Sequence, residues 1–372
     1  MRILHVLGSL NRGGVEIWLM DILRHIDRQR FEMDFLTHSP VEGTFDREAA
    51  ALGARIIRFP YSRRPHVYAR EFPRVLSKYG PYDVVHSHVH LYSGYVLALA
   101  ARAGIRCRIA HSHNDTAACE AARPPIRKLY AACMKAGIRW YATVGLAASR
   151  SAAAALFGRG WQQAPRWRLL YYGIDGERFL PQSGRERLRN RLGIPADARV
   201  VVHVGRFDPQ KNHRFLVAIA AAAIRQESNL HFVFAGDGPL RPQIEALCGS
   251  AGILPRCHFL GVRSDIPEIL GAADAFLFPS FYEGLGLALI EAQAAGVPCV
   301  YSDAVPEEAE IVPRLGTKLP LSDGVSGWVS ALVGVVSQPP QCLACEARAL
   351  FERSRFTIQR STAALVDCYS EA

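Results

Sequence analysis

The chain has 372 residues, of which 49% are hydrophobic and 21% charged, and its formal net charge is +10. This composition is that of an ordinary globular protein and excludes a disordered chain. The length exceeds what one hydrophobic core supports and predicts two domains, and the positive charge favours an anionic partner such as nucleic acid, an anionic membrane or a phosphorylated substrate.

Short apolar runs alternate with helical patterns along almost the whole sequence. In the first half, strands are expected at 2–7, 31–37, 55–59, 83–88, 106–111, 142–147 and 168–170, with helices such as 15–26 and 93–103 between them. In the second half, strands are expected at 199–204, 230–235, 257–260, 275–278 and 297–301, with helices at 214–226, 240–251, 266–272 and 287–295. This alternation predicts parallel, doubly wound α/β sheets.

The strand series restarts after the polar, basic segment 173–191. We therefore predict two doubly wound, Rossmann-like domains, one at residues 1–175 and one at residues 176–355. A last helical pattern, within residues 356–372, is expected to pack back on the first domain.

Two sequence features bear on the compartment of the protein. No apolar run reaches the ~18 residues that cross a bilayer, and Asn11 and Arg12 break the first run, so we expect a buried strand there and no signal peptide. The nine cysteines are irregularly spaced, and Cys342 and Cys345 form an isolated Cys-x-x-Cys. This pattern argues against a disulfide framework and a zinc ribbon and favours a reducing cytoplasm.

Residues 278–298 combine the end of a strand, a loop with two glycines and a helix. Backbone N–H groups at 284–287 and the helix dipole would suit a diphosphate. Glu283 lies at the carboxyl end of the strand, where open α/β sheets bind ligands, and Glu291 lies one turn into the helix. The alternative is that Glu291 is a solvated helix residue and the glycines form a tight turn.

Two further loops follow strands and precede helices. Arg206 and Lys211 bracket the first of these loops, where two cations could clamp the same diphosphate. Gly13 and Gly14 open a helix after the first strand and could approach the phosphate or the sugar. The alternatives are two ordinary surface cations and a plain strand-to-helix turn.

Histidines cluster at predicted strand ends. His86, His88 and His90 alternate and would share one face of an extended segment, and His111 and His113 repeat the pattern. Such spacing suits zinc or copper, but the chain has no Asp-x-Asp and no His-Glu-x-x-His, so we expect no metal. One or two of these histidines are expected to line a sugar site and the others to pack.

Together these segments resemble the retaining glycosyltransferase family 4, which has the glycosyltransferase-B fold, and especially its capsular and exopolysaccharide branch of CapH-like and EpsF-like enzymes. The resemblance runs from the first strand to about Trp328. It rests on residues 108–114, 203–207, 211–212, 236–240, 259–267 and 283–293. It implies two domains that face each other across a cleft, with the acceptor on the first and the nucleotide sugar on the second.

The resemblance also implies roles for individual residues. Arg206 and Lys211 would neutralise the leaving diphosphate in place of a metal, Glu283 would contact the donor sugar, Glu291 would hold the ribose, and His113 would lie beside the reacting sugar. The implied donor-binding residues are Gly13, Gly14, Gly205, Val262 (through its backbone, beside the base), Gly284, Leu285, Gly286, Leu287 and Glu291.

The sequence departs from the family at two positions. Tyr172 stands where the family often has Asn, and Gly286 stands where many members have Pro. Neither position is expected to carry the chemistry, although both weaken any inference about which sugar is moved.

The predicted function is a retaining, metal-independent and cofactor-independent transfer of a sugar, with a UDP-sugar as the expected donor. The expected acceptor is a glycan linked to a polyprenyl diphosphate, in capsule or exopolysaccharide biosynthesis. The protein is expected in the cytoplasm and at the inner face of the membrane, where the basic, aromatic segment 123–141 would dock on anionic lipid. That segment could instead be a surface helix that simply covers the first sheet.

Three alternatives remain open from sequence. A nucleotide-sugar epimerase of the same architecture would need no acceptor, and a phosphorylase would need a pyridoxal lysine that the sequence does not identify. A non-catalytic sugar-nucleotide-binding protein would not need the intact set of charged residues. Nucleic acid is not an expected partner, because no aromatic-basic motif and no helix-turn-helix signal is present.

Overall fold

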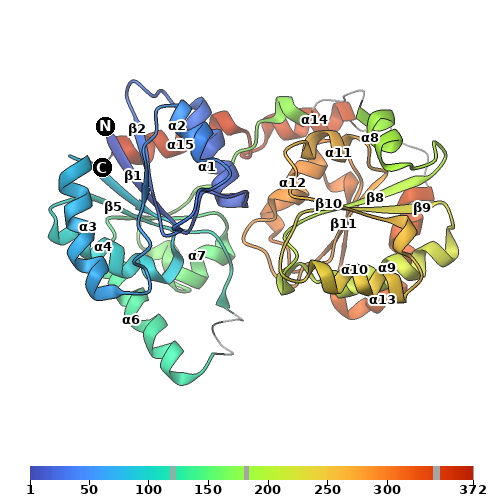
Figure 1. Cartoon of the computed structure of the whole chain (residues 1–372), viewed down its shortest axis with the longest axis horizontal. Helices are drawn as coiled ribbons and strands as arrows, with labels where there is room; N and C mark the ends of the chain where they lie inside the picture. The colour runs from blue at the N-terminus through green and yellow to red at the C-terminus, as the bar shows by residue number, and fades with distance from the viewer. Residues whose placement is uncertain (118–119, 121–122, 180–183, 338–343, 372) are drawn as a thin grey trace. The chain divides into compact units, whose positions relative to one another are not determined.

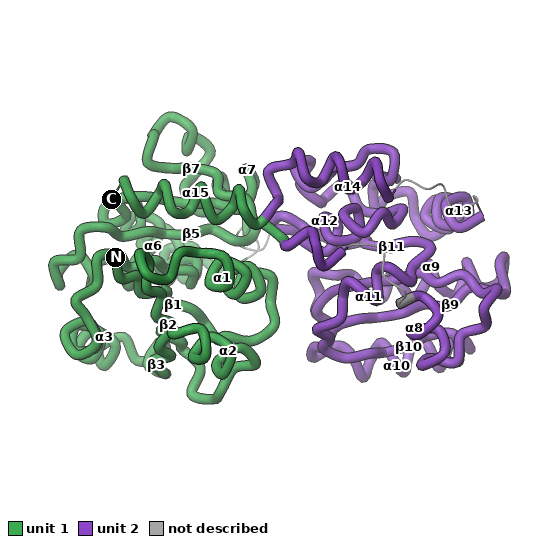
Figure 2. Tube along the Cα trace, turned by 90° about the horizontal axis from the view of Figure 1, so that it is seen from above, with its two compact units in different colours: residues 1–174, 358–372 green, residues 175–357 purple. Residues whose placement is uncertain are grey.

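The computed structural model describes residues 1–117, 120, 123–179, 184–337 and 344–371. The chain divides into two compact units (Figure 2): unit 1 is Met1–Ile174 with Ile358–Ala372, and unit 2 is Asp175–Thr357. The division falls one residue from the predicted boundary. The predicted last helix is α15 (Ile358–Ser370), and it belongs to unit 1.

Unit 1 is built on a seven-stranded parallel sheet in the order β3-β2-β1-β4-β5-β6-β7. Its strands are β1 Arg2–Leu7, β2 Glu32–Thr37, β3 Ile56–Arg58, β4 Val84–Ser87, β5 Cys107–Ser112, β6 Val144–Ala147 and β7 Trp167–Leu169. Helices α1 (Gly14–His25), α2 (Asp46–Ala51) and α15 lie on one face, and α3 (Pro65–Tyr79), α4 (Ser93–Arg102), α6 (Pro125–Tyr141) and α7 (Arg150–Phe157) lie on the other (Figure 1).

Unit 2 repeats this plan on a six-stranded parallel sheet in the order β10-β9-β8-β11-β12-β13. Its strands are β8 Arg199–Val204, β9 Leu230–Ala235, β10 Cys257–Gly261, β11 Ala275–Phe278, β12 Cys299–Ser302 and β13 Gly316–Leu319. One face carries α9 (His213–Gln226), α10 (Arg241–Ser250) and α13 (Gly324–Ser337); the other carries α8 (Gly184–Leu192), α11 (Ile266–Gly271), α12 (Leu287–Ala294) and α14 (Ala344–Arg353) (Figure 1).

Helices on both faces bury the strands, which explains why most strands read as continuous apolar runs. All six residues of β9 are buried, whereas those of β13 are only half-buried. Strand β13 has the sequence Gly-Thr-Lys-Leu, which is not an apolar run, and the sequence analysis therefore missed it.

Helix α15 is joined to unit 1 by specific bonds as well as by packing. The indole Nε1 of Trp18 on α1 donates to Ser361 Oγ on α15 at 2.9 Å, and Ser361 Oγ donates to the carbonyl of Tyr171 at 2.8 Å. The backbone N–H of Ile358 donates to the carbonyl of Ile174 at 3.0 Å. The last helix of the chain therefore completes the domain that the first strand begins.

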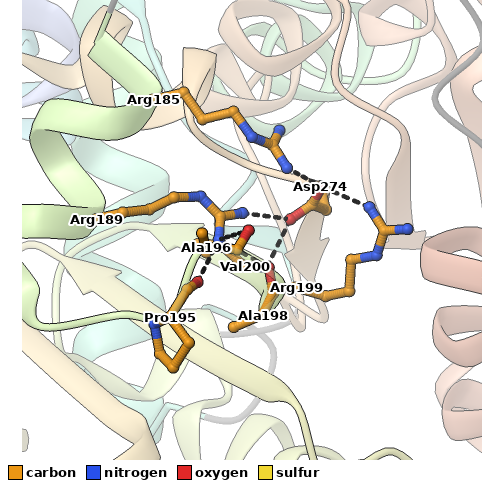
Figure 3. A network of polar contacts seen from close by, with 8 residues as sticks. All are labelled: Arg185, Arg189, Pro195, Ala196, Ala198, Arg199, Val200 and Asp274. Carbon is orange, nitrogen blue, oxygen red and sulfur yellow. Dashed lines mark hydrogen bonds and ion pairs between the residues drawn. The ribbon is translucent and has the colours of Figure 1, made fainter.

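A polar network fixes the start of the sheet in unit 2 (Figure 3). The carboxylate of Asp274 pairs with Arg185, Arg189 and Arg199 and accepts the backbone N–H of Val200 at 2.8 Å. The other terminal nitrogen of Arg189 donates to the carbonyls of Pro195, Ala196 and Ala198. The network ties α8 to the amino end of β8, at the end of the sheet opposite the loops that carry the predicted site.

Two further observations complete the fold. Within the described residues, none of the helices is both long and apolar enough to cross a bilayer. The described cysteines are all free thiols. Cys342 of the Cys-x-x-Cys pair lies outside the described residues.

Candidate active site

The predicted site residues of unit 2 meet at the carboxyl ends of β8 and β11. Lys211, in the loop after β8, places Nζ 2.6 Å from Oε1 of Glu283, in the loop after β11. Gln210 donates to the second carboxylate oxygen at 3.2 Å and to the carbonyl of Tyr282 at 2.9 Å. The Glu283 side chain is only 6% exposed and that of Lys211 15%. Each carboxylate oxygen of Glu283 therefore has a fixed donor.

This pairing divides the predicted cations into two kinds. The charge of Lys211 is balanced by Glu283, and its ammonium also lies 4.5 Å from the centre of the Phe278 ring. Arg206, at the start of the same loop, is exposed. Among the described residues Arg206 forms no ion pair, so its guanidinium is the uncompensated charge of the site.

Glycines allow the loops after β8, β9 and β10 to touch through their backbones. A Cβ on Gly236 would lie 1.9 Å from the carbonyl oxygen of Gly205, and Gly236 has a φ of +144°. The N–H of Gly236 donates to the carbonyl of Gly261 at 2.8 Å. Only glycine permits this approach, which explains the glycine that begins the Gly-Asp-Gly segment. Val262, the predicted contact of the base, lies directly after β10 and is 56% exposed.

The start of α12 has the backbone expected of an anion-binding turn. Gly286 caps the helix in the left-handed region with a φ of +87°, which proline, fixed near −65°, cannot adopt. The departure from the family at this position therefore follows from the backbone. Gly284 and Leu285 are buried beside it, and Glu291 lies half-buried one turn further along the helix.

The histidines of unit 2 add no charge to this site. Burial lowers the pKa of His203 well below its ordinary value, and His203 Nδ1 lies 2.9 Å from the carbonyl of Leu277. Burial, followed by the charge of Lys211, lowers the pKa of His213 to about 4. Near neutral pH these two rings therefore add no positive charge to that of Arg206 and Lys211.

In unit 1 the predicted residues also lie at carboxyl ends of strands. Gly13 and Gly14 follow β1 and begin α1, with Gly13 in extended backbone. His113 follows β5, and both of its ring nitrogens are hydrogen-bonded, one to His88 at 2.8 Å and one to the hydroxyl of Tyr172. A hydrogen bond from this ring to a sugar therefore requires one of these bonds to exchange, whereas a contact through the carbon atoms of the ring does not.

The histidine cluster is larger than the sequence predicted and differs in membership. His86 and His88 join His111 and His113, but His90 has a φ of 50°, begins a 3₁₀ turn and bonds to Thr116 at 2.8 Å. The expectation that His90 shares their face was wrong, because the extended segment ends before it. The cluster also contains three residues that sequence reasoning missed: His5, Tyr172 and Tyr369.

The histidine cluster contains two groups of potential metal ligands. Two trios, His5 with His86 and His88, and His88 with His111 and His113, hold ring nitrogens within 4.8 Å of one another. Yet these nitrogens are already bonded to another ring or to a tyrosine hydroxyl, and only Nε2 of His111 lacks a partner among the described residues. The arrangement fits a hydrogen-bonded network better than a metal centre, and metal independence stays a prediction.

The two-unit architecture defines the class of protein, which is the glycosyltransferase-B fold. HepE from Anabaena, solved with UDP and glucose, has a TM-score of 0.81 at 20% identity over 100% of both chains. WaaG, a glycosyltransferase of lipopolysaccharide biosynthesis, has a TM-score of 0.78 at 20% identity, over 98% of this chain and 99% of its own. These likenesses establish the fold.

Sequence comparison then gives the family. The family described as Glycosyl transferases group 1 matches residues 184–323, and the Glycosyl transferase 4-like domain matches residues 13–173. The putative glycosyltransferase EpsF of Bacillus subtilis is 33% identical over 350 residues, 89% of this chain and 86% of its own. The capsular polysaccharide glycosyltransferase CapH of Staphylococcus aureus is 26% identical over 84% of this chain and 83% of its own. The chain belongs to this family and is a glycosyltransferase.

Proposed function

We propose that this glycosyltransferase moves a sugar from a UDP-sugar to a glycan acceptor with retention of configuration and without a metal ion. The observation that carries the proposal is the ion pair between Lys211 and Glu283, which joins the loop after β8, where the exposed Arg206 also lies, to the loop that leads into α12. Cations and free backbone N–H groups that converge at the carboxyl end of a parallel sheet suit a diphosphate. Unit 2 then holds the nucleotide and unit 1 is the acceptor side.

The chemistry follows from where charge develops. The bond between the anomeric carbon and the diphosphate oxygen breaks, and the acceptor oxygen bonds to that carbon on the same face. Negative charge on the diphosphate is stabilised by Arg206, Lys211 and the backbone at Gly286, and the diphosphate takes the acceptor proton. Glu283 accepts a sugar hydroxyl and is not the nucleophile, because Lys211 and Gln210 hold its two oxygens.

Relatives support the choice of donor and acceptor. HepE binds UDP in its solved complex. A UDP-galactose: GlcNAc-diphosphoundecaprenol galactosyltransferase of Escherichia coli is 35% identical over 170 residues, which is 44% of this chain and 43% of its own. We therefore propose a UDP-sugar donor and an acceptor carried on a polyprenyl diphosphate, in exopolysaccharide or capsule assembly.

Such an acceptor requires contact with a membrane, and α6 has the surface for it. One side of this helix packs on α4, where a Cβ on Gly94 would lie 2.3 Å from the carbonyl of Met134. The expectation of a helix that merely covers the sheet accounts for this side only. The other side exposes a stripe of large apolar residues, whose exposed fractions are Ile126 72%, Leu129 61%, Tyr130 42% and Trp140 82%.

Three of the four lysines and arginines of α6 add positive charge to this exposed face. Arg127, Lys128 and Arg139 are exposed, but Lys135 pairs with Glu120 at 2.7 Å and is not available to lipid. Three cations beside exposed aromatic and aliphatic side chains suit the headgroup region of an anionic bilayer. We propose that α6 holds the enzyme at the inner face of the cytoplasmic membrane.

Turnover tests the proposal directly. The purified protein is incubated with UDP-, GDP- and ADP-sugars, with and without a polyprenyl-diphosphate-linked acceptor, and the anomeric configuration of the product is read by NMR. We expect transfer from a UDP-sugar only when the acceptor is present, with retention. Conversion of the free nucleotide sugar without acceptor would instead identify an epimerase, and an inverted product would refute the proposed stereochemistry.

A further inference from the structure

Seven side chains of unit 1 form one unbranched series of hydrogen bonds, which we call the histidine network. Its histidines come from β1, β4 and β5, which are neighbours in the sheet, and from the residues that follow them. In order, its bonds join His111 Nδ1 to His86 Nε2 (3.1 Å), His86 Nδ1 to Tyr369 Oη (2.9 Å), Tyr369 Oη to His5 Nε2 (3.4 Å), His5 Nδ1 to His88 Nε2 (2.9 Å), His88 Nδ1 to His113 Nε2 (2.8 Å), and His113 Nδ1 to Tyr172 Oη.

The five histidines of this network are neutral near neutral pH. Burial lowers the pKa of each one far below its ordinary value, to about 3 for His5 and His113. A neutral imidazole has one N–H donor and one bare acceptor nitrogen. Each bond of the series needs one donor and one acceptor, so from one histidine to the next the direction of a bond is passed on. The hydroxyl of Tyr369 has one proton and two lone pairs, and if both His86 and His5 donated to it, its own buried proton would have no acceptor in the network. The two arrangements that leave no such proton at Tyr369 run in a single direction from end to end.

The two arrangements differ in what they leave unpaired at His111. If all protons point toward Tyr172, Nε2 of His111 is a bare lone pair; if they point the other way, it is a buried N–H. His111 has no exposed surface, and this nitrogen has no partner among the described residues. An unpaired buried donor carries the full cost of its lost hydration, and orphaned N–H groups are rarer in proteins than under-used acceptors.

The other end of the network favours the same direction. Burial and then the carboxylate of Glu16 raise the pKa of Tyr172 well above its ordinary value. A negative charge at that end attracts the protons of the series toward Tyr172. In this direction each histidine donates through Nδ1 and accepts through Nε2, and Nδ1–H is the minor tautomer of a free histidine side chain.

We propose that the histidine network has this single direction, with all five histidines as Nδ1–H tautomers, and that it positions His113 for sugar transfer. The positioning of His113 for sugar transfer rests on the proposed function, whereas the direction of the network does not. His88 donates to His113, which in turn donates to Tyr172, so the ring orientation and the tautomer of His113 are both fixed. A neutral His113 does not oppose the positive charge that develops on the sugar, whereas an imidazolium would. His5, His86, His88, His111 and Tyr369 act as positioning residues through it.

The direction of the network is measured on the protein without any substrate. Long-range ¹⁵N–¹H correlation spectra of the ¹⁵N-histidine-labelled full chain report the tautomer of each ring, with single His→Gln variants for assignment. We expect Nδ1–H at all five positions between pH 7 and pH 8. An Nε2–H tautomer at any of the five overturns the proposal, because a single reversed bond is incompatible with an unbranched series in this direction.

Removing one hydroxyl separates a positioning role from a purely structural one. Tyr369→Phe leaves His86 Nδ1 without an acceptor, so His86 and His111 lose their unique arrangement and populate both tautomers, while His88 and His113 keep theirs. The matched control is Tyr68→Phe: Tyr68 is as fully buried as Tyr369 and bonds to His38 Nε2 at 3.1 Å outside the network. The control leaves all five tautomers unchanged.

Kinetics then test the connection to the reaction. Tyr369→Phe also removes the donor to His5 Nε2, so His5 binds a proton more readily and its positive charge, transmitted through His88, opposes the charge that develops beside His113. We therefore expect Tyr369→Phe to move the acid limb of the kcat profile to higher pH with little change in the KM for the donor, and Tyr68→Phe to leave the limb in place. If all five histidines are Nδ1–H tautomers but the acid limb of the kcat profile does not shift in Tyr369→Phe, the positioning role is overturned. A protein that transfers no sugar would refute the proposed function, and the NMR result would still decide the direction of the network.

Discussion

Lys211 and Glu283 form the pair that the rest of the unit 2 site surrounds, and their closeness changes what Lys211 does. A lysine paired at 2.6 Å with a buried carboxylate is held in place and must share its charge with any diphosphate that binds. Arg206 carries no such partner among the described residues. The two cations that the sequence presents as equivalent therefore differ in role: Lys211 orients Glu283, and Arg206 supplies the free charge.

This difference predicts distinct outcomes for two alanine variants. Arg206→Ala and Lys211→Ala should each reduce kcat by roughly 10²-fold, because the first removes the free charge aimed at the developing diphosphate, and the second removes a shared charge together with the donor that orients Glu283. Lys211→Ala should in addition lower the melting temperature, because it leaves Glu283 buried and unpaired. The control is Arg214→Ala, an exposed arginine on α9, which should change neither quantity. Near-normal rates in both site variants would contradict the assignment.

Chelation tests whether Arg206 and Lys211 suffice to neutralise the leaving group without a metal ion. With Arg206 and Lys211 neutralising the leaving group, transfer should persist in excess EDTA, measured as the initial rate before and after dialysis against the chelator. If turnover disappears and returns with Mg²⁺ or Mn²⁺, the leaving group depends on a metal. If Zn²⁺ restores it, the trios around His88 become the first residues to examine.

Among the elements, α6 has two different apolar faces on a single helix. Ala131 and Ile138 are buried toward unit 1, whereas Ile126 and Trp140 are exposed. The helical pattern of residues 123–141 predicts the helix and its basic residues, but it does not say which apolar positions remain uncovered. That information comes only from the packing on α4.

The exposed face predicts salt-sensitive membrane binding. Replacing Arg127, Lys128 and Arg139 by Gln should weaken co-sedimentation with phosphatidylglycerol vesicles by roughly 10²-fold, at about 1 kcal/mol per basic residue. Donor binding should be unaffected. The control variant, with the exposed residues Arg63, Arg64 and Arg106 changed to Gln, carries the same charge change away from α6. Equal sedimentation of the two triple variants would exclude α6 as the docking element.

At the scale of the whole molecule, both parallel sheets and most of their strands follow from apolar periodicity. The same is true of Arg206, Lys211 and Glu283, because residues that follow strands of one parallel sheet share its carboxyl edge. What periodicity cannot give is contact between distant segments. Tyr369 bonds to His86 across 283 positions, and the pairing of Asp274 with Arg185 spans 89. His90 turned away because its local backbone ended the extended segment, a change of conformation that an alternating pattern does not reveal.

The buried neutral histidines predict how stability depends on pH. Their pKa values in the folded protein lie below the ordinary 6.5, at about 3 for His5 and His113 and about 4 for His38 and His213. Between these values and pH 6.5 the unfolded chain binds more protons than the folded one. The contribution of these histidines to the free energy of unfolding is therefore fully present above about pH 6.5. It is lost as pH falls toward their pKa values in the folded protein, by up to about 1.4 kcal/mol per pH unit per histidine.

A thermal unfolding series from pH 8 to pH 5 measures this dependence. The melting temperature should be nearly constant down to about pH 6.5 and then fall steeply, because several such histidines together reach the size of the whole folding free energy. A melting temperature that stays flat to pH 5 would mean that these rings are protonated in the folded protein as readily as in the unfolded chain.

Because α15 belongs to unit 1, the order of synthesis differs from the order of completion. A ribosome that has released residues 1–357 has supplied all of unit 2, but it has not yet supplied the helix that pairs with Trp18 and brings Tyr369 to the central histidines. Domains generally fold as units during translation, the earlier one first. Here synthesis of unit 1 begins first, but unit 1 receives α15 only after all of unit 2 has been made. Until then His86 and His5 lack their hydrogen bonds to Tyr369.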